Sequence, residues 1–240
     1  MRKLNLNLRE TEKPKGKNPG QHLQVKSKKR VADHGEVFTN EREVNAMLDL
    51  VKQETERIDS RFLEPACGEG VFLMEVLRRK LNVVESRYSK NQIEYEHYAF
   101  LAISSLYGID ILQDNVDICK KNLYDIFFSR YEKLFKSSTS KEYLASIRFL
   151  LYRNIIHGDA LTYKTCGFIE EPITFSEWSL AFSGNVQRRD YKLKHLLETK
   201  AYDGPNLFSD LGEDVFIPEP LKTFPLQNIN NICEDVQTQL

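Results

Sequence analysis

Three acidic side chains follow short apolar stretches of the sequence, in places where a carboxylate could bind a polar ligand. Glu64 could accept a hydrogen bond from an ammonium or another polar group, and Asp110 could bind both hydroxyl groups of a ribose. Asp159 could accept a hydrogen bond from the exocyclic amine of an adenine. Each acid could instead cap a turn or a following helix. Three acids in the same kind of position are less easily explained by chance than one.

A glycine-containing turn joins the first of these acids to the next apolar stretch. Residues 64–70 read Glu-Pro-Ala-Cys-Gly-Glu-Gly, so glycines stand at Gly68 and Gly70. Glycine lets the backbone approach a ligand closely and adopt a positive φ. The N–H groups at the start of the following helix can bind polar ligand atoms. Taken alone, the turn fits a nucleotide-like ligand, and it fits equally a tight connection that binds nothing.

The hydrophobic spacing predicts the scaffold that would bring these residues together. Short apolar segments alternate with segments of helical periodicity, an order typical of a parallel sheet covered by helices. The carboxyl ends of such strands meet at one edge, where open α/β sheets bind ligands. We therefore predict an α/β fold, with a mostly parallel sheet and helices on both faces. The expected elements are a helix from Glu41 capped by Thr39 or Asn40, a strand at 61–63, a helix at 71–81, a polar connection at 82–91, a helix at 92–106, a strand at 106–111, helices at about 114–135 and 140–151, and a strand at 154–159.

Composition and charge divide the chain into three parts. Residues 1–30 carry ten Lys or Arg against two Glu, a net charge of about +8, while the remaining residues sum to about −9. This basic segment lacks periodic hydrophobic residues, so we expect a flexible arm that could follow a DNA backbone or bind nothing. Residues 31–202 are the predicted domain, with a further strand at 173–182 and a helix at 191–200. Residues 203–240 are expected to pack on it as an irregular tail.

The cysteines and the hydropathy of the chain favour a reduced, cytoplasmic protein. No two of the four cysteines form a CxxC pair, which argues against a zinc site and a disulfide framework. We therefore expect no metal. No apolar run approaches the 18 or so residues of a membrane span, so no membrane partner is expected. Charges also stand where a signal peptide would place its apolar region.

Two further features have a structural and a functional interpretation each. Trp178 could stack on a nucleic-acid base, but packing in the core is the favoured interpretation. Arg188-Arg189 forms a basic cluster with Lys192 and Lys194. This cluster could contact phosphates or simply form a solvated face.

Four motifs in order resemble those of bacterial adenine-specific DNA methyltransferases, the modification subunits of restriction systems. Residues 64–70 resemble their cofactor loop, and residues 35–39, Gly-Glu-Val-Phe-Thr, resemble the segment just upstream that lies over the methionine part of the cofactor. Residues 108–111 and 158–161 resemble the ribose-binding and adenine-binding motifs. The resemblance covers about residues 30–165. Asn40 stands where the family usually has a proline.

The resemblance implies a Rossmann-like methyltransferase fold and S-adenosylmethionine as the cofactor. Glu64 and Asp110 would hold the cofactor, Phe38 and Thr39 would cover it, and Asp159 would contact its adenine. The full set of cofactor-binding residues implied by the motifs is Phe38, Thr39, Glu64, Pro65, Ala66, Cys67, Gly68, Gly70, Asp110, Ile111, Asp159 and Ala160.

The catalytic motif of the family has no clear counterpart here. In the family, an Asn-Pro-Pro-Tyr sequence holds the amine of a flipped adenine and stacks on the base. This chain contains no Pro-Pro pair, and the nearest remnant is residues 182–186, Phe-Ser-Gly-Asn-Val. Asn185 follows an apolar stretch there and is the candidate catalytic residue.

The leading hypothesis is an adenine-specific DNA methyltransferase of a restriction-modification system, or its cofactor-binding subunit. DNA would be its partner, together with a specificity or endonuclease subunit, because the chain lacks room for a large target-recognition domain. One alternative is a regulatory module that binds S-adenosylmethionine without chemistry. Another is a methyltransferase for RNA, protein or a small molecule.

Overall fold

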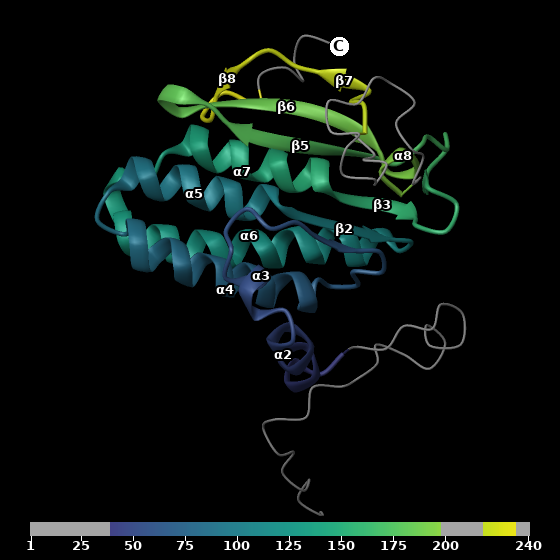
Figure 1. The fold of residues 1–240 in the computed structure, drawn as a ribbon, viewed down its shortest axis with the longest axis horizontal. Helices are drawn as coiled ribbons and strands as arrows, with labels where there is room; N and C mark the ends of the chain where they lie inside the picture. The colour runs from purple at the N-terminus through teal and green to yellow at the C-terminus, as the bar shows by residue number, and fades with distance from the viewer. Residues whose placement is uncertain (1–38, 198–217, 234–240) are drawn as a thin grey trace, which may run out of the picture. The chain divides into compact units, whose positions relative to one another are not determined.

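The computed structural model describes residues 39–197 and 218–233 of the chain, which form an α/β structure (Figure 1). Phe38, the predicted basic arm at 1–30 and much of the predicted tail lie outside the described residues. The first helices are α2 (Glu41–Asp49) and α3 (Lys52–Thr55). The predicted cap of α2 is confirmed, because the Asn40 side chain accepts a hydrogen bond from the Arg42 N–H. None of the described helices is both long and apolar enough to cross a membrane.

Three of the four strands of the first sheet are parallel to one another. They are β1 (Phe62–Glu64), β2 (Leu106–Asp110) and β3 (Ile155–Asp159), in that spatial order, and the antiparallel β4 (Lys164–Thr165) follows at the β3 edge. Glu64 is in register with Gly108, and Asp110 with His157. The mostly parallel sheet predicted from the sequence is therefore confirmed, and the carboxyl ends of its strands lie at one edge.

Four long helices connect these strands and pack on one another in a ring. α4 leaves β1 and contacts β1 and β2, α6 contacts β2 and β3, and α5 and α7 lead directly into β2 and β3. The predicted polar connection at 82–91 is wrong, because α4 continues as far as Tyr88. Val84, three residues after the buried Leu81, is fully buried and extends its apolar side by a turn. The helices and the short turn between α6 and α7 are α4 (Val71–Tyr88), α5 (Gln92–Ser104), α6 (Gln113–Phe135), η1 (Lys136–Ser138) and α7 (Lys141–Asn154).

A second, antiparallel sheet follows in the chain and lies above α5 and α7 in Figure 1. The predicted helix at 191–200 is wrong in its first residues, since the strand β6 continues to Lys192 and only Leu193–Leu197 is described as helix. Part of the predicted irregular tail instead forms two short strands that pair with β6. The elements are β5 (Thr174–Leu180), η2 (Phe182–Gly184), β6 (Asn185–Lys192), α8 (Leu193–Leu197), β7 (Lys222–Thr223) and β8 (Gln227–Asn228).

The inward side of β6 carries charges that neutralise one another. The buried Arg188 guanidinium donates to both oxygens of the buried Asp190, at 2.7 and 2.6 Å. Asp190 also accepts hydrogen bonds from Ser176 at 2.7 Å and from Arg153 at 3.2 Å. Arg188 is therefore a core residue and cannot contribute to a phosphate-binding surface.

The tryptophan of β5 is also a core residue. Trp178 is 5% exposed and makes edge-to-face contacts with Phe100 of α5 and Phe149 of α7. The packing interpretation of Trp178 is confirmed.

The second sheet helps to cover one face of the first, where the sequence predicted helices alone. Tyr107 and Ile109 of β2 pack in a buried cluster with Ile173, Phe175 and Leu193, from the start of β5 and from α8. Successive residues of a strand point to opposite faces, so Gly108 and Asp110 point to the other face. There Leu73 of α4 lies next to Gly108.

The free edge of β5 is closed by side chains from the first sheet and its helices. The Asn154 side chain accepts a hydrogen bond from the Ser176 N–H at 3.3 Å, and the Tyr107 hydroxyl donates to the Ser176 carbonyl at 3.3 Å. Strand edges expose unpaired backbone groups unless something covers them. The two parts of the described structure are thus joined by hydrogen bonds between side chains and backbone as well as by apolar packing.

Candidate functional site

The turn after β1 is held by its own backbone and by β2. The Cys67 N–H donates to the Ile109 carbonyl at 2.8 Å, and the Gly70 N–H donates to the Cys67 carbonyl at 2.8 Å. Gly68 has φ +52° and Gly70 has φ +88°, both in the left-handed region that favours glycine. The two glycines therefore allow the chain to turn from β1 into α4 within six residues.

The two glycines have different surroundings. A Cβ on Gly70 would lie 2.6 Å from the Cys119 Sγ of α6, so Gly70 lets the turn pack against that helix. A Cβ on Gly68 would have no atom of the described residues within 4 Å. Gly68 therefore presents backbone to open space, the arrangement that allows a ligand to approach the main chain.

Asp110 connects the turn to the end of β2. Its Oδ2 accepts a hydrogen bond from the Gly68 N–H at 2.8 Å, and its Oδ1 accepts one from the Leu112 N–H at 2.9 Å. The Asn115 side chain adds a third contact, to Oδ1 at 3.3 Å. The carboxylate is only 8% exposed. The helix cap suggested by the sequence is absent, because the N-cap of α6 is Leu112 and no side chain caps it. Asp110 instead closes a turn just before α6 and clamps the glycine turn. Its Oδ2 retains a lone pair for a ligand, whereas Oδ1 already accepts two hydrogen bonds.

Glu64 lies on the other side of the turn, at the end of β1. It is partly buried and accepts a hydrogen bond from the Ala66 backbone. Burial raises the pKa of Glu64 above its ordinary value, because a charged carboxylate loses hydration there. Pro65 and Ala66 are exposed at the tip of the turn.

The cysteine of the turn is a packing residue. Cys67 is 6% exposed, and its hydrogen bond with the Cys119 thiol and its burial raise its pKa far above the ordinary value. The thiol therefore remains protonated, and a protonated thiol is a poor nucleophile. Cys67 positions the turn by packing next to Gly108 of β2.

The start of α4 can bind a polar group. Its N-cap is Gly70, which supplies no side chain to the first N–H groups, and its first turn contains no acidic residue. The first N–H groups of a helix have no partner within the helix and carry a partial positive charge. An oxygen of a ligand next to Gly68 would lie close to them.

The end of β3 lies beside the end of β2. Asp110 and His157 are register partners, and the His157 Nε2 lies 3.0 Å from the Ile111 carbonyl oxygen. Asp159 follows two residues later, and its Oδ1 accepts a hydrogen bond from the Leu161 N–H at 2.8 Å, which closes a turn. Ile111 is 50% exposed at this edge. Ala160, next to Asp159, is partly buried.

The structure therefore brings together most of the residues expected from the sequence and separates Asn185 from them. The turn, Asp110 and Asp159 share the carboxyl edge of the parallel strands. Asn185 lies at the start of β6, where its neighbour Gly184 adjoins His97 of α5. In Figure 1 this end of the β5–β6 hairpin lies over the opposite side of the helices from the end of β3. Thr39 is exposed just before the N-cap of α2, and Phe38 lies outside the described residues.

Two residues of the site were missed in the sequence. Asn115 supports Asp110, and Cys119 lies beneath Gly70. Both lie on the buried side of α6, four residues apart. Residues at this spacing share a helix face. The spacing could be read from the sequence, but it is the same as that of ordinary core residues of a helix.

Comparisons with known proteins add no family to this geometry. No protein-family model, no curated protein and no solved structure matches the chain. Within the described part of the chain, no group of three or more His, Cys, Asp or Glu side chains could hold a metal ion.

Proposed function

We propose that this chain binds S-adenosylmethionine as an adenine-specific DNA methyltransferase of a restriction-modification system, or as its cofactor-binding subunit. The observation that carries the proposal is the contact of the Asp110 carboxylate with the Gly68 N–H. It fixes an acidic side chain beside an open glycine backbone at the carboxyl edge of parallel strands. That edge is where α/β sheets bind nucleotide-like ligands.

The residues at this edge suit the polar groups of S-adenosylmethionine. Gly68 leaves open space for a ligand, and the Asp110 Oδ2 retains a lone pair that can accept a hydrogen bond from a ribose hydroxyl. Glu64 offers a carboxylate for the ammonium of the methionine part. A bound ammonium would lower the pKa of Glu64, opposing the increase that burial causes. The donor set therefore fits the cofactor that the sequence motifs imply.

Each residue has a defined task in the proposed reaction. The cofactor supplies an electrophilic methyl group on a sulfonium when bound. Glu64 holds the ammonium of its methionine part, Asp110 holds its ribose, and Asp159 at the end of β3 accepts a hydrogen bond from its adenine amine. A Rossmann-like methyltransferase fold, in which the carboxyl edge carries both cofactor and substrate, is part of this proposal. The target base would be flipped from the duplex to reach that edge.

The position of Asn185 supports a second candidate function, a cofactor-binding module without catalytic groups of its own. Asn185 is the only candidate catalytic residue that the sequence suggested, and it lies on the β5–β6 hairpin, next to Gly184, which adjoins His97 of α5. In this version of the proposal another polypeptide holds the target adenine.

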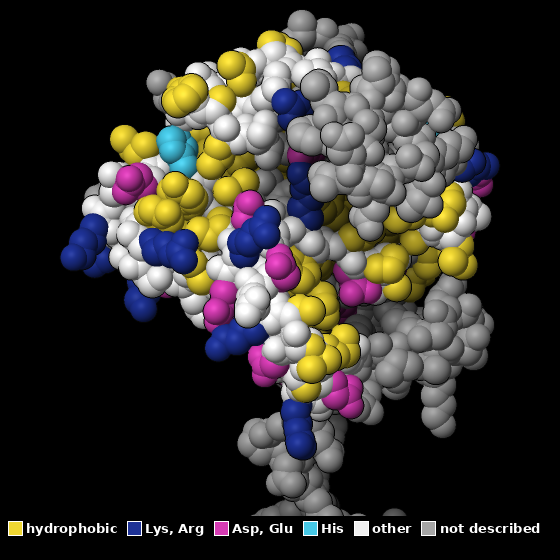
Figure 2. Space-filling model, in the orientation of Figure 1, with side chains coloured by type: hydrophobic (Ala, Val, Ile, Leu, Met, Phe, Trp, Pro, Cys, Tyr) yellow, Lys and Arg dark blue, Asp and Glu magenta, His cyan; other side chains and the backbone are white. Residues whose placement is uncertain are grey.

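On the face drawn in Figure 2, basic and acidic side chains are interspersed over the described residues. The described residues of this face therefore form no continuous basic stripe of the kind that usually follows a DNA backbone.

Calorimetry with S-adenosylmethionine tests the binding half of the proposal. We expect the wild type to bind and Gly68→Trp to lose binding, because the new side chain would occupy the open space beside Asp110. The matched control is Gly167→Trp, an exposed glycine with no side chain nearby, which should bind normally. Circular dichroism checks that both variants fold. Absence of binding to the wild type would overturn both candidate functions.

A methyl-transfer assay separates the two candidates. Radiolabelled methyl transfer to adenine in duplex DNA by the chain alone would establish the enzyme. Binding without transfer, even with added specificity and endonuclease subunits, would establish the module. Transfer to RNA, protein or small molecules but not to DNA would replace the DNA substrate with one of these.

A further inference from the structure

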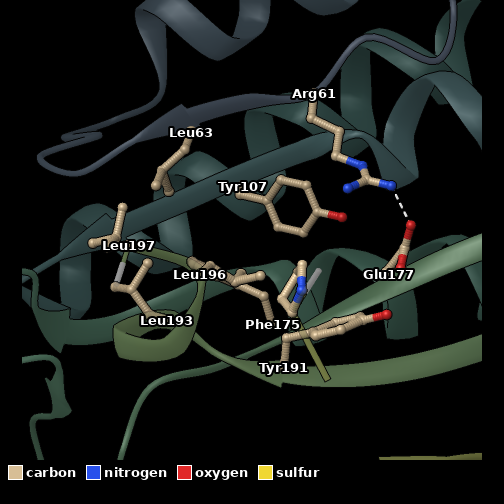
Figure 3. A pocket seen from close by; sticks show the side chains of 10 residues that line it. Arg61, Leu63, Tyr107, Phe175, Glu177, Tyr191, Leu193, Leu196 and Leu197 are labelled. Atoms are coloured by element: carbon tan, nitrogen blue, oxygen red, sulfur yellow. Dashed lines mark hydrogen bonds and ion pairs between the residues drawn. The ribbon is translucent and has the colours of Figure 1, made fainter. Parts of the chain in front are cut away.

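A cavity of about 360 Å³ lies between the first sheet and the β5–β6 hairpin, away from the site described above (Figure 3). Leu63 and Tyr107, register partners in β1 and β2, form one wall. Phe175 and Tyr191, register partners in β5 and β6, form the opposite wall. The cavity thus lies between two sheets, and register-paired strands form both of its walls. It is partly open to solvent, since the lining residue Leu63 is 41% exposed.

The cavity lies on the opposite face of the first sheet from the glycine turn. Tyr107 points into it, whereas Gly108 and Asp110 point to the α4 side because side chains alternate along a strand. Ligand pockets range from about 300 to 1,000 Å³. A cavity at the lower end of this range suits a compound of one or two rings, and its position on the other face of the sheet sets it apart from the glycine turn. This cavity is therefore a separate site.

One end of the cavity is apolar and aromatic. Tyr107 and Phe175 contact each other edge to face, with ring centroids 5.0 Å apart, and Leu193 and Leu196 of α8 complete this region. Figure 3 shows the leucine side chains and the aromatic rings directed into the same space. Aromatic walls favour flat aromatic ligands, which can stack on them or meet them edge to face.

The other end of the cavity is polar but close to neutral in charge. Arg61 and Glu177 form an ion pair there, drawn as a dashed line in Figure 3. Burial and the neighbouring Glu177 raise the pKa of Tyr191 above its ordinary value, so its hydroxyl keeps its proton. Because the two charges offset each other, this end disfavours both anions and cations. The Glu177 carboxylate can still accept a hydrogen bond from a neutral ligand.

We propose that this cavity binds a small, neutral aromatic compound that carries one N–H donor. The ring of this compound packs against Tyr107, Phe175 and the leucines of α8, and its N–H group donates a hydrogen bond to the Glu177 carboxylate. The site is independent of the proposed cofactor site and does not require the proposed function to be correct.

Indole and 1-methylindole are matched probes for this proposal, since they share a ring system and differ in the N–H. We expect indole to bind and to shift the methyl NMR signals of Leu63 and Leu193. 1-Methylindole should bind about tenfold more weakly or worse, because a hydrogen bond to a charged acceptor is lost. Glu177→Gln should reduce this preference, since its amide oxygen is a neutral acceptor.

Two leucine variants provide the spatial control. Leu196→Trp should abolish indole binding by filling the cavity, while Leu161→Trp, at an 89% exposed leucine outside the cavity, should leave it unchanged. If Leu196→Trp does not fold, the proposal is still tested by the ratio of the dissociation constants of 1-methylindole and indole, which should be smaller in Glu177→Gln than in the wild type. No indole binding up to its solubility limit, methyl shifts confined to other regions, or equal affinities of both probes would overturn the proposal.

Discussion

The Asp110 Oδ2 lies 2.8 Å from the Gly68 nitrogen, so a residue at the end of β2 holds the turn that follows β1. The same carboxylate binds the Leu112 N–H and the Asn115 side chain. One buried acid therefore orders the turn, the start of α6 and the space between them. A ligand at this edge would meet a preformed backbone.

Replacing this acid by its amide should weaken both the fold and the site. Asp110→Asn turns one acceptor oxygen into a donor NH₂ group, which faces either the Gly68 or the Leu112 N–H. Loss of a hydrogen bond to a buried charged group costs about 1.5–3 kcal/mol, so the free energy of unfolding in urea should fall by about that amount. Affinity for S-adenosylmethionine should fall as well.

The matched control for this change is Asp125→Asn, on the exposed side of α6 in a surface pair with Lys121. It should change stability by less than about 1 kcal/mol. Equal stabilities of Asp110→Asn and wild type would show that the clamp contributes nothing.

The two glycines of the turn should respond differently to alanine. At Gly70 the new Cβ would lie 2.6 Å from the Cys119 Sγ, so overpacking of about 1–3 kcal/mol adds to about 1–2 kcal/mol of left-handed strain. At Gly68 only the strain applies, because the surrounding space is open. Urea unfolding should therefore rank Gly70→Ala as the less stable variant. Adding Cys119→Ala should restore part of the loss only to Gly70→Ala, and the opposite ranking would contradict the packing described here.

Lys80 should make stability depend on pH above neutrality. Its amine is fully buried in α4 and donates to the Ile58 and Ser60 carbonyls and to Ser105. Burial lowers the pKa of Lys80 from 10.5 to about 7. Between these values the unfolded chain binds more protons than the folded protein, so this residue makes the protein more stable as pH rises from about 7 to 10.5.

The comparison of wild type with Lys80→Met isolates this effect. The difference in unfolding free energy should grow in favour of the wild type between pH 7 and 9, by at most about 1.4 kcal/mol per pH unit. The exposed Lys52→Met serves as the control and should show no such slope. If the difference between wild type and Lys80→Met does not change with pH, the Lys80 amine has the same pKa in the folded and the unfolded protein.

Asp190 should be essential to the β5–β6 hairpin. Asp190→Asn leaves the guanidinium groups of Arg188 and Arg153 without a carboxylate in a buried region. Breaking a buried ion pair by removing one partner destabilises by about 3–5 kcal/mol. Thermal unfolding should show a large loss, whereas Glu170→Gln, in the exposed pair with Lys164, should change little. Similar melting temperatures for the two variants would refute the assigned role of Asp190.

The parallel strands were predictable because each lies between helices with regular apolar spacing. β2 reads Leu-Tyr-Gly-Ile-Asp and is buried along its whole length, so an apolar run with a terminal acid was a sufficient signal. The turn and its acids followed from strand ends and glycine positions. Their hydrogen-bond partners on α6 did not, because Asn115 and Cys119 resemble any buried helix residues.

The second sheet was harder to predict, for a reason visible in β6. Its inward positions include Arg188 and Asp190, so the alternation of apolar and polar residues that identifies a half-buried strand is absent. Only the three-dimensional pairing of these charges makes their burial favourable. The last two turns of α4 were not predicted for another reason. Most residues after Leu81 are polar, and Val84 alone continues the buried side of the helix there.

The covering of β2 by later residues also has a consequence for synthesis on the ribosome. Tyr107 and Ile109 are packed by residues 173–193, which are made more than 60 residues later. At about 5–20 residues per second, this apolar face emerges several seconds before its cover exists. The nascent chain therefore passes through a stage at which this apolar face has no cover, and slower translation would lengthen that stage.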